Sequence, residues 1–227
     1  MSFDSYKIPR HNVFISYYHK DDQLYKDFLC SLYEWNYEKC CRQAIFENWS
    51  VMDGDIDDSY MTDEDIRIKI RDEYIDSNAS VLILLCGEHT RGRKHIDWEL
   101  YSAMYDGKDR PKLGILIINL PSIDSRCNII AAGDDKSLVS DNKSWNPIKT
   151  RKQIEEAHPF LPERLIDNYE SRISDDSIVD VSIVSWNRIK DDVEILKKLI
   201  HSAYIKGKDS SKHYNHSRKM RRNDSLQ

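Results

Sequence analysis

The residue best placed to do chemistry in this sequence is a glutamate, Glu99, which follows a continuous apolar run at 81–86. Apolar side chains then recur at helical spacing and predict a helix from about residue 95 to 104 with one buried face: Ile96, Leu100, Ala103 and Met104. At about 100° per residue, Glu99 lies at the border of that face and Trp98 points away from it. A carboxylate there, one turn into a helix that follows a central strand, can meet a ligand in an α/β protein.

Strands and helices that alternate along the chain must position this carboxylate. Apolar segments predict strands at 13–16, 44–46, 81–86, 113–120 and 178–184. The intervening helices include one that starts at Asp21 or Asp22, with its inward side chains expected at Leu24, Phe28, Leu32 and Trp35. Thr62 and Asp65 form a capping-box pattern for another helix. This alternation predicts an α/β fold with a parallel sheet and right-handed crossovers.

The strand order decides what lies near Glu99. With the order 2-1-3-4-5, the crevice opens where strands one and three diverge, at their carboxyl ends. Residues 16–19 and 86–99 then line one pocket, which brings Ser16 toward Glu99. Taken alone, a glutamate at this place is more commonly a surface residue that pairs along the helix.

Length and composition favour one domain, because 227 residues contain no Pro/Gly/Ser-rich linker. We expect a loose lead-in at 1–10, a folded domain at 11–205 and an irregular insertion at 121–159, where no period is visible. The segment 206–227 has a net charge of +5 in a chain of net charge −5 and is poor in apolar residues, so we expect a disordered tail. The remaining acidic body argues against nucleic acid as the main ligand.

Location and redox state follow from what the sequence lacks. No apolar run has the length of a membrane span, and the N-terminus lacks the order of a signal peptide, so we expect a cytoplasmic protein without a membrane partner. The five cysteines are odd in number and show no repeated metal-ligand spacing, which favours reduced thiols.

A glycine-containing loop precedes the Glu99 helix but is not a nucleotide-binding loop. Gly87 and Gly92 have P-loop spacing, yet Arg93 and Lys94 stand where Lys and Ser/Thr are needed. No Gly-x-Gly-x-x-Gly is present, which leaves a dinucleotide-binding domain of the Rossmann type unsupported. Arg91, Arg93 and Lys94 either meet an anionic ligand or form a solvated basic loop, and the solvated loop is the commoner case.

No metal or phosphorylation site is predicted. An acidic loop matches only part of a calcium-binding pattern, because Asp58 replaces the required glycine: Asp53, Asp55, Asp57 and Asp58. His213 and His216 supply half of a metal site. A receiver domain would need an aspartate at the end of the third strand, where the chain has Cys86 and Gly87.

Three stretches together resemble the TIR-like domain family of the Thoeris antiphage protein ThsB. They are Val-Phe-Ile-Ser-Tyr-Tyr-His-Lys-Asp-Asp at 13–22, Ser-Asn-Ala-Ser-Val-Leu-Ile-Leu-Leu-Cys-Gly-Glu-His-Thr at 77–90 and Arg-Lys-His-Ile-Asp-Trp-Glu-Leu at 93–100. A weaker likeness at Trp186 extends the resemblance over roughly 11–205. The resemblance implies a flavodoxin-like TIR fold with a central parallel sheet of about five strands in the order 2-1-3-4-5 and helices on both faces.

The resemblance also implies an activity. Such domains cleave the nicotinamide–ribose bond of NAD and make an ADP-ribose-derived, in some cases cyclic, signal that activates a separate effector protein after a phage-derived trigger. NAD is then a substrate, with no separate cofactor or metal. The family's catalytic glutamate falls on Glu99. The family often has Trp four residues before that glutamate, where this chain has His95.

One carboxylate suffices for this chemistry, because the nicotinamide ring is already cationic and departs as a neutral molecule. Glycosidases need a second carboxyl group to protonate their leaving group. We expect Glu99 to hydrogen-bond the ribose hydroxyls and to stabilise the oxocarbenium-like charge. The expected nucleotide-binding residues are Phe14 and Ser16, with Tyr17, Tyr18 and Trp98 as stacking candidates.

Two alternatives use the same fold. A TIR domain can act by self-association without chemistry, and Trp98, Tyr101 and Tyr105 would then face a partner. An enzyme similar to nucleoside deoxyribosyltransferases would use a similar carboxylate on free nucleosides and ignore NAD. A glutamate at position 99 favours the NAD-cleaving enzyme.

Overall fold

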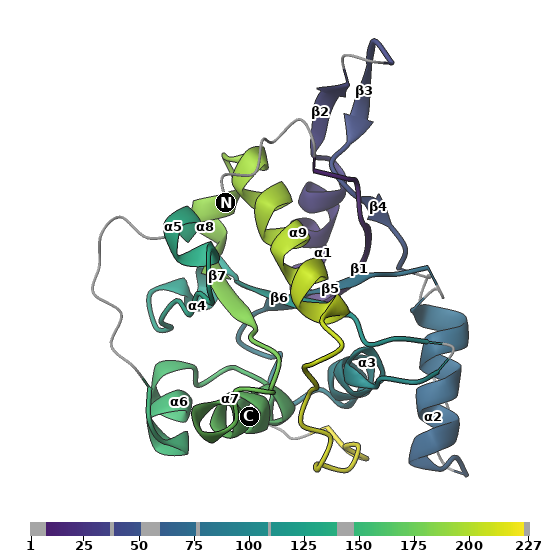
Figure 1. Ribbon diagram of the computed structural model, residues 1–227, viewed down its shortest axis with the longest axis vertical. Coiled ribbons are helices and arrows are strands. Elements are labelled where there is room, and N and C mark those ends of the chain that lie inside the picture. Colours follow the sequence, from purple (N-terminus) through teal and green to yellow (C-terminus); the bar gives the residue numbers. More distant parts are fainter. Residues whose placement is uncertain are drawn as a thin grey trace.

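A parallel five-stranded sheet forms the centre of the computed structural model, which describes residues 8–36, 39–50, 60–75, 78–108, 110–139 and 148–224 (Figure 1). Its strands, in spatial order, are β4 (Glu47–Asn48), β1 (Asn12–Ser16), β5 (Val81–Cys86), β6 (Gly114–Asn119) and β7 (Ser182–Ser185). Numbered along the chain, these five strands have the order 2-1-3-4-5, which confirms the predicted topology. The chain therefore has the expected α/β, flavodoxin-like TIR fold.

Helices cover both faces of the sheet, which explains why all residues of β5 and β6 are buried. Side chains such as Phe14 and Leu82 pack on one face against α2 (Asp63–Lys69), α3 (Lys94–Met104) and α7 (Glu163–Ser174). Alternate side chains pack on the other face against α1 (His19–Cys30), α8 (Trp186–Ile189) and α9 (Val193–Lys208). A π-helical turn, η2 (Ile70–Tyr74), continues α2.

The start of α2 follows the predicted capping box. The backbone N–H of Asp65 donates to the Thr62 hydroxyl at 3.1 Å, and the Asp65 carboxylate accepts from the Thr62 backbone at 2.9 Å. The acidic loop of the calcium hypothesis, 51–59, and residues 1–7 of the expected lead-in lie outside the described residues.

The region after β1 differs from the prediction. The helix ends at Cys30, and the chain then forms an antiparallel hairpin, β2 (Tyr33–Asn36) with β3 (Cys41–Ala44), which projects at the top of Figure 1. The predicted second strand at 44–46 was wrong, because β1 pairs with Glu47–Asn48 instead. The prediction of which side chains of α1 face inward was also wrong, because Leu24 is 80% exposed whereas Leu29 is buried. The buried side of α1 is displaced by one residue, about 100° around the helix, from the predicted stripe.

The expected irregular insertion at 121–159 contains short helices. They are α4 (Pro121–Asp124), α5 (Asp135–Val139) and α6 (Arg151–Ala157). Each is too short for its period to stand out in the sequence. Ile123 and Ile154 are buried, so these helices belong to the packed domain.

The tail expected to be disordered is ordered in its described part, 206–224. Helix α9 continues to Lys208, and the following segment packs between α3 and α7 (Figure 1). Tyr214 and Met220 are buried in the same apolar cluster as Phe14. The prediction failed because few apolar residues anchor this segment, and its charged residues find partners in the body instead of water.

None of the helices built from the described residues is both long and apolar enough to cross a lipid bilayer.

Candidate functional site

Ser16 and Glu99 meet at the carboxyl end of the sheet, as the strand order predicted. Ser16 ends β1 and pairs with Leu84 of β5, and the chain after β5 turns back to form α3. The Ser16 hydroxyl donates a hydrogen bond to Oε2 of Glu99 at 2.5 Å. Ser16 is buried and Glu99 is half-buried, so the carboxylate is held at an edge that a ligand can approach.

The loop between β5 and α3 is built to bring α3 back over the sheet. The hydroxyl of the buried Thr90 accepts a hydrogen bond from the backbone N–H of Gly87 at 2.8 Å. The backbone carbonyl of Thr90 accepts a second one from the backbone N–H of Arg93 at 3.3 Å. A Cβ at Gly87 would lie 2.9 Å from a carboxylate oxygen of Asp22, so any larger residue there would have to displace the Asp22 side chain. The loop therefore packs closely against α1.

Tyr18 lies at the rim of this edge. The Arg93 guanidinium lies 3.9 Å from the centre of the half-buried Tyr18 ring and donates to the carbonyl of His89 at 3.3 Å. The His89 ring in turn contacts Asp21 at 2.7 Å. The loops after β1 and β5 are tied together by these contacts, and Tyr18 is the predicted stacking residue that stays at the rim.

Tyr17 and Phe14 have no side-chain role at this edge. The Phe14 ring is 3% exposed and lies in the core between the sheet and α3. Tyr17 packs on the opposite face of the sheet, where its hydroxyl donates to Gln23 at 2.6 Å and its ring stacks on His19. Phe14 lies on the same face of the sheet as Ser16 but is covered by core side chains, whereas Tyr17 lies on the opposite face, so neither ring is placed to contact a nucleotide beside Glu99.

Trp98 is also covered. The ring is fully buried, and its indole N–H donates to the carbonyl of Arg221 at 2.7 Å. The sequence placed Trp98 opposite the sheet-facing side of α3, which is correct, but the C-terminal segment lies over that side. With its ring covered in this way, Trp98 has no open face for a ligand ring in this structure.

All three basic residues of the loop have partners within the chain, since Arg93, besides its contacts with Tyr18 and His89, lies 3.4 Å from the Asp224 carboxylate. Arg91 donates to Glu163 and to the carbonyl of Pro159, and Lys94 lies over the Trp98 ring at 5.1 Å. His95 packs edge-on against the same ring, with centroids 4.9 Å apart. His95 and Glu99 are four residues apart, so the imidazole lies one turn before the carboxylate on the same side of α3.

Asp22 is a second carboxyl group close to this edge that sequence reasoning treated only as a helix start. It is 5% exposed, and burial raises its pKa to about 6, with a further contribution from the charge of Asp21. A backbone hydrogen bond from Tyr18 opposes this rise. The sequence gives little indication of this buried carboxyl group, because an aspartate is common in the first turn of a helix.

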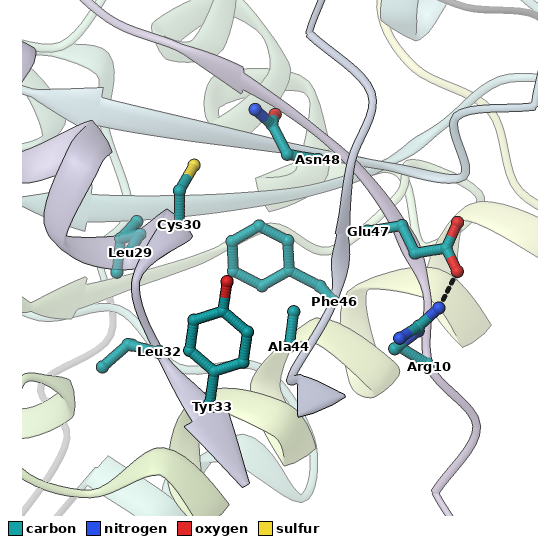
Figure 2. A pocket seen from close by; sticks show the side chains of 9 residues that line it. All are labelled: Arg10, Leu29, Cys30, Leu32, Tyr33, Ala44, Phe46, Glu47 and Asn48. Atoms are coloured by element: carbon teal, nitrogen blue, oxygen red, sulfur yellow. Dashed lines mark hydrogen bonds and ion pairs between the residues drawn. The ribbon is translucent and has the colours of Figure 1, made fainter. Parts of the chain in front are cut away.

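A separate cavity of about 250 Å³ lies at the C-terminal end of α1, beside β2, β3 and β4 (Figure 2). It is lined by Arg10, Leu29, Cys30, Leu32, Tyr33, Ala44, Phe46, Glu47 and Asn48. Arg10 and Glu47 form an ion pair at its margin, and burial raises the pKa of the Cys30 thiol. None of the predicted site residues lines this cavity.

Comparison with known proteins identifies one family. Residues 14–125 match the family model described as the TIR-like domain of the Thoeris protein ThsB. No curated protein matches the chain, and no solved structure does. The matched residues include both Ser16 and Glu99, so the two sides of the candidate site lie within the match.

Proposed function

Because residues 14–125 belong to the TIR-like domain family of the Thoeris protein ThsB, we propose that the chain cleaves the nicotinamide–ribose bond of NAD in antiphage defence. The ADP-ribose portion then becomes a diffusible signal that activates a separate effector protein. The observation that supports this proposal most is the Ser16–Glu99 hydrogen bond at the carboxyl edge of the sheet. It holds one carboxylate at the place where such folds bind ligands.

Glu99 is the proposed catalytic residue. As the C–N bond breaks, electrons pass to the nicotinamide ring and positive charge develops on the ribose. A carboxylate beside the ribose stabilises that charge and accepts hydrogen bonds from its hydroxyls. The half-buried position of Glu99 weakens screening by solvent, which strengthens this electrostatic interaction.

Ser16 and Tyr18 are the proposed contributors around Glu99. The Ser16 hydroxyl holds the carboxylate in one orientation, and the Tyr18 ring, backed by Arg93, offers a face to the nucleotide. His95 stands where the family often has Trp, so an imidazole replaces an indole one turn before Glu99. No residue is needed to protonate the leaving group, since nicotinamide departs neutral.

Nicotinamide release tests the proposed substrate. Extracts of cells that express the chain, with and without phage challenge, are incubated with NAD and separated by chromatography. We expect nicotinamide and an ADP-ribose-derived product in equal amounts after challenge. Cleavage of free nucleosides with NAD untouched would assign the chain to deoxyribosyltransferase-type chemistry instead.

A second candidate function, assembly without chemistry, is favoured by large apolar side chains that are exposed on α1 and on the β2–β3 hairpin. These side chains are Leu24 (80%), Trp35 (52%), Tyr33 (47%) and Phe28 (38%). The surface first predicted for this role is occupied, since Trp98 is buried and Tyr101 and Tyr105 contact His216. If Leu24→Asp abolishes self-association and wild-type protein releases no nicotinamide, assembly is the function.

A further inference from the structure

The C-terminal segment, residues 209–224, lies across the side of α3 that faces away from the sheet (Figure 1). Helix α3 carries Glu99, so it is held between two surfaces, the sheet on one side and this segment on the other. The segment contacts α3 at its start, through Lys94, Asp97 and Trp98, and again near its end, through Tyr101.

Two buried side chains anchor the segment to the body. The Tyr214 hydroxyl donates to the carbonyl of Leu113 at 2.9 Å, and both Tyr214 and Met220 are at most 4% exposed. Between them, the His216 ring packs edge-on against Tyr101 of α3. These anchors place the last described residues beside the start of α3.

Asp224 supplies a cap that α3 lacks in its own sequence. The residue before the helix, Arg93, makes no side-chain cap, and the Asp224 carboxylate instead accepts from the backbone N–H of Lys94 at 2.8 Å. An anion at this position satisfies an orphan N–H group and interacts favourably with the helix dipole. The distal end of the segment therefore fixes the first turn of α3.

Asp97 and Trp98 form the second connection. The Asp97 carboxylate accepts from the backbone N–H of Arg221 at 2.8 Å, and the Trp98 indole donates to the carbonyl of Arg221 at 2.7 Å. The backbone N–H and the backbone carbonyl of Arg221 are therefore both hydrogen-bonded to side chains of α3. Glu99 is the next residue after Trp98.

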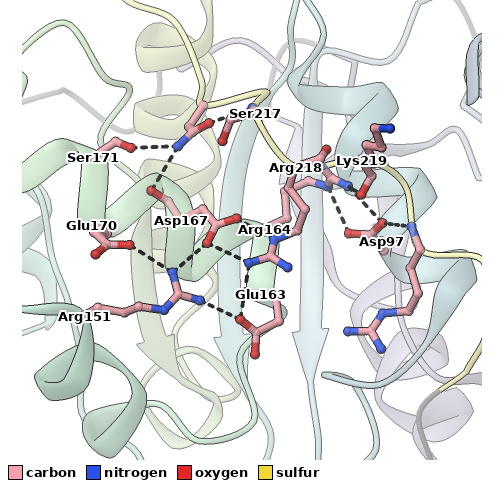
Figure 3. Close-up of polar contacts among 12 residues, drawn as sticks. Asp97, Arg151, Glu163, Arg164, Asp167, Glu170, Ser171, Ser217, Arg218 and Lys219 are labelled. Carbon is pink, nitrogen blue, oxygen red and sulfur yellow. Dashed lines mark hydrogen bonds and ion pairs between the residues drawn. The ribbon is translucent and has the colours of Figure 1, made fainter.

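Arg164 of α7 joins the segment to α3, as Figure 3 shows. Its guanidinium makes a bidentate pair with Asp97 at 3.0 and 2.9 Å and donates to the carbonyls of Arg218 and Lys219 at 2.8 and 3.2 Å. The pair is buried, with side-chain exposure of 0% for Arg164 and 8% for Asp97. Such a planar fork holds its partners in one geometry.

We propose that this segment positions the catalytic glutamate, with Trp98 and Asp224 as positioning residues that keep α3 where Glu99 meets Ser16. The inference rests on the proposed function of Glu99. The segment touches the helix on the side opposite the sheet, so it acts through the placement of α3. A shift of about 1 Å in a catalytic group can cost roughly 100-fold in rate, and a hydrogen bond of 2.5 Å leaves little room for such a shift.

The test compares Trp98→Phe and Asp224→Ala with wild type in the full chain, by nicotinamide release and by hydrogen exchange of the amides at 94–98. Trp98→Phe keeps a ring but removes the indole donor. We expect kcat to fall about 10-fold in each variant with KM within about twofold, and exchange in the first turn of α3 to become faster. Asp224→Asn, which retains a capping oxygen, should recover most of the loss.

Matched controls are Tyr60→Phe, at a residue that is 98% exposed, and Asp191→Ala, whose side chain is 84% exposed. Both should leave kcat and exchange in α3 unchanged. If Trp98→Phe and Asp224→Ala retain wild-type kcat while Glu99→Gln loses it, the segment does not position the glutamate and the proposed function stands. If wild-type protein is inactive after challenge, the proposed function fails and the positioning proposal falls with it.

Discussion

At the scale of single residues, the hydrogen bond between Ser16 and Glu99 matters most. Both residues were predicted from the sequence to share a pocket, because the carboxyl ends of adjacent parallel strands meet at one edge. The roles of the aromatic residues were not predictable in the same way. Whether Tyr17 or Trp98 faces a ligand depends on which other segment covers it, and that is a long-range property.

Ser16→Ala tests what the hydroxyl contributes. It removes the donor to the Glu99 carboxylate in a buried site, and a hydrogen bond to a charged group contributes about 1.5–3 kcal/mol. We expect kcat for nicotinamide release to fall about 10-fold or more, while Ser125→Ala on an exposed turn leaves it unchanged. Equal rates for the two variants would mean that Ser16 has no part in orienting Glu99.

Asp22 gives the protein a specific pH dependence of stability. Its pKa rises from 3.8 to about 6 on folding, so the folded chain binds this proton more tightly than the unfolded chain. The stabilisation it gives is present below about pH 4 and is lost as the pH rises to about 6. Asp22→Asn cannot ionise, so it should be more stable than wild type at pH 7 by about 2 kcal/mol, with a smaller difference at pH 4.

Urea unfolding of both proteins at pH 4 and pH 7 measures this difference. Asp191→Asn, which removes an exposed carboxylate from the turn between α8 and α9, is the matched control, and its difference in stability from wild type should be the same at both pH values. A difference between Asp22→Asn and wild type that is the same at both pH values would show that Asp22 ionises normally in the folded chain.

At the scale of elements, the main differences between prediction and structure have a common cause. The sequence correctly placed Trp98 on the side of α3 away from the sheet, and composition then suggested that nothing ordered covered it. In the structure, polar contacts to Asp97, Arg164 and Asp167 hold the C-terminal segment there. Contacts of this kind join residues far apart in the chain and leave no periodic pattern.

The packing of α9 on β6 depends on two facing glycines. A Cβ on Gly207 would overlap the backbone nitrogen of Gly114, because the helix and strand backbones touch at this point. Gly207→Ala should therefore force α9 away from the sheet and lower the free energy of unfolding by about 3 kcal/mol. Lys208→Ala, at the next and exposed position of α9, should change it by less than about 0.5 kcal/mol.

Thermal and urea unfolding of the two variants make this comparison. If Gly207→Ala proves as stable as Lys208→Ala, α9 is not in close backbone contact with β6 in solution. The tail that follows α9 would then also be placed differently, since it begins at the end of this helix.

At the scale of the whole molecule, the sheet and its strand order were predictable, because β5 and β6 are apolar on both faces and helical segments separate the strands. The β2–β3 hairpin and the short helices of 121–159 were not, since neither has the length or period that sets an element apart. The site's two polar residues follow from topology alone. The surroundings of the site, formed by Arg93, His95 and the C-terminal segment, could be identified only from the three-dimensional structure.

The proposed reaction depends on one carboxylate, so the most direct test is the rate of nicotinamide release by Glu99→Gln. Glu156→Gln, an exposed glutamate of α6, is the matched control. After phage challenge, we predict that Glu99→Gln is at least about 100-fold slower than wild type, while Glu156→Gln is unchanged. Release by folded Glu99→Gln within a few-fold of wild type would contradict the proposed chemistry.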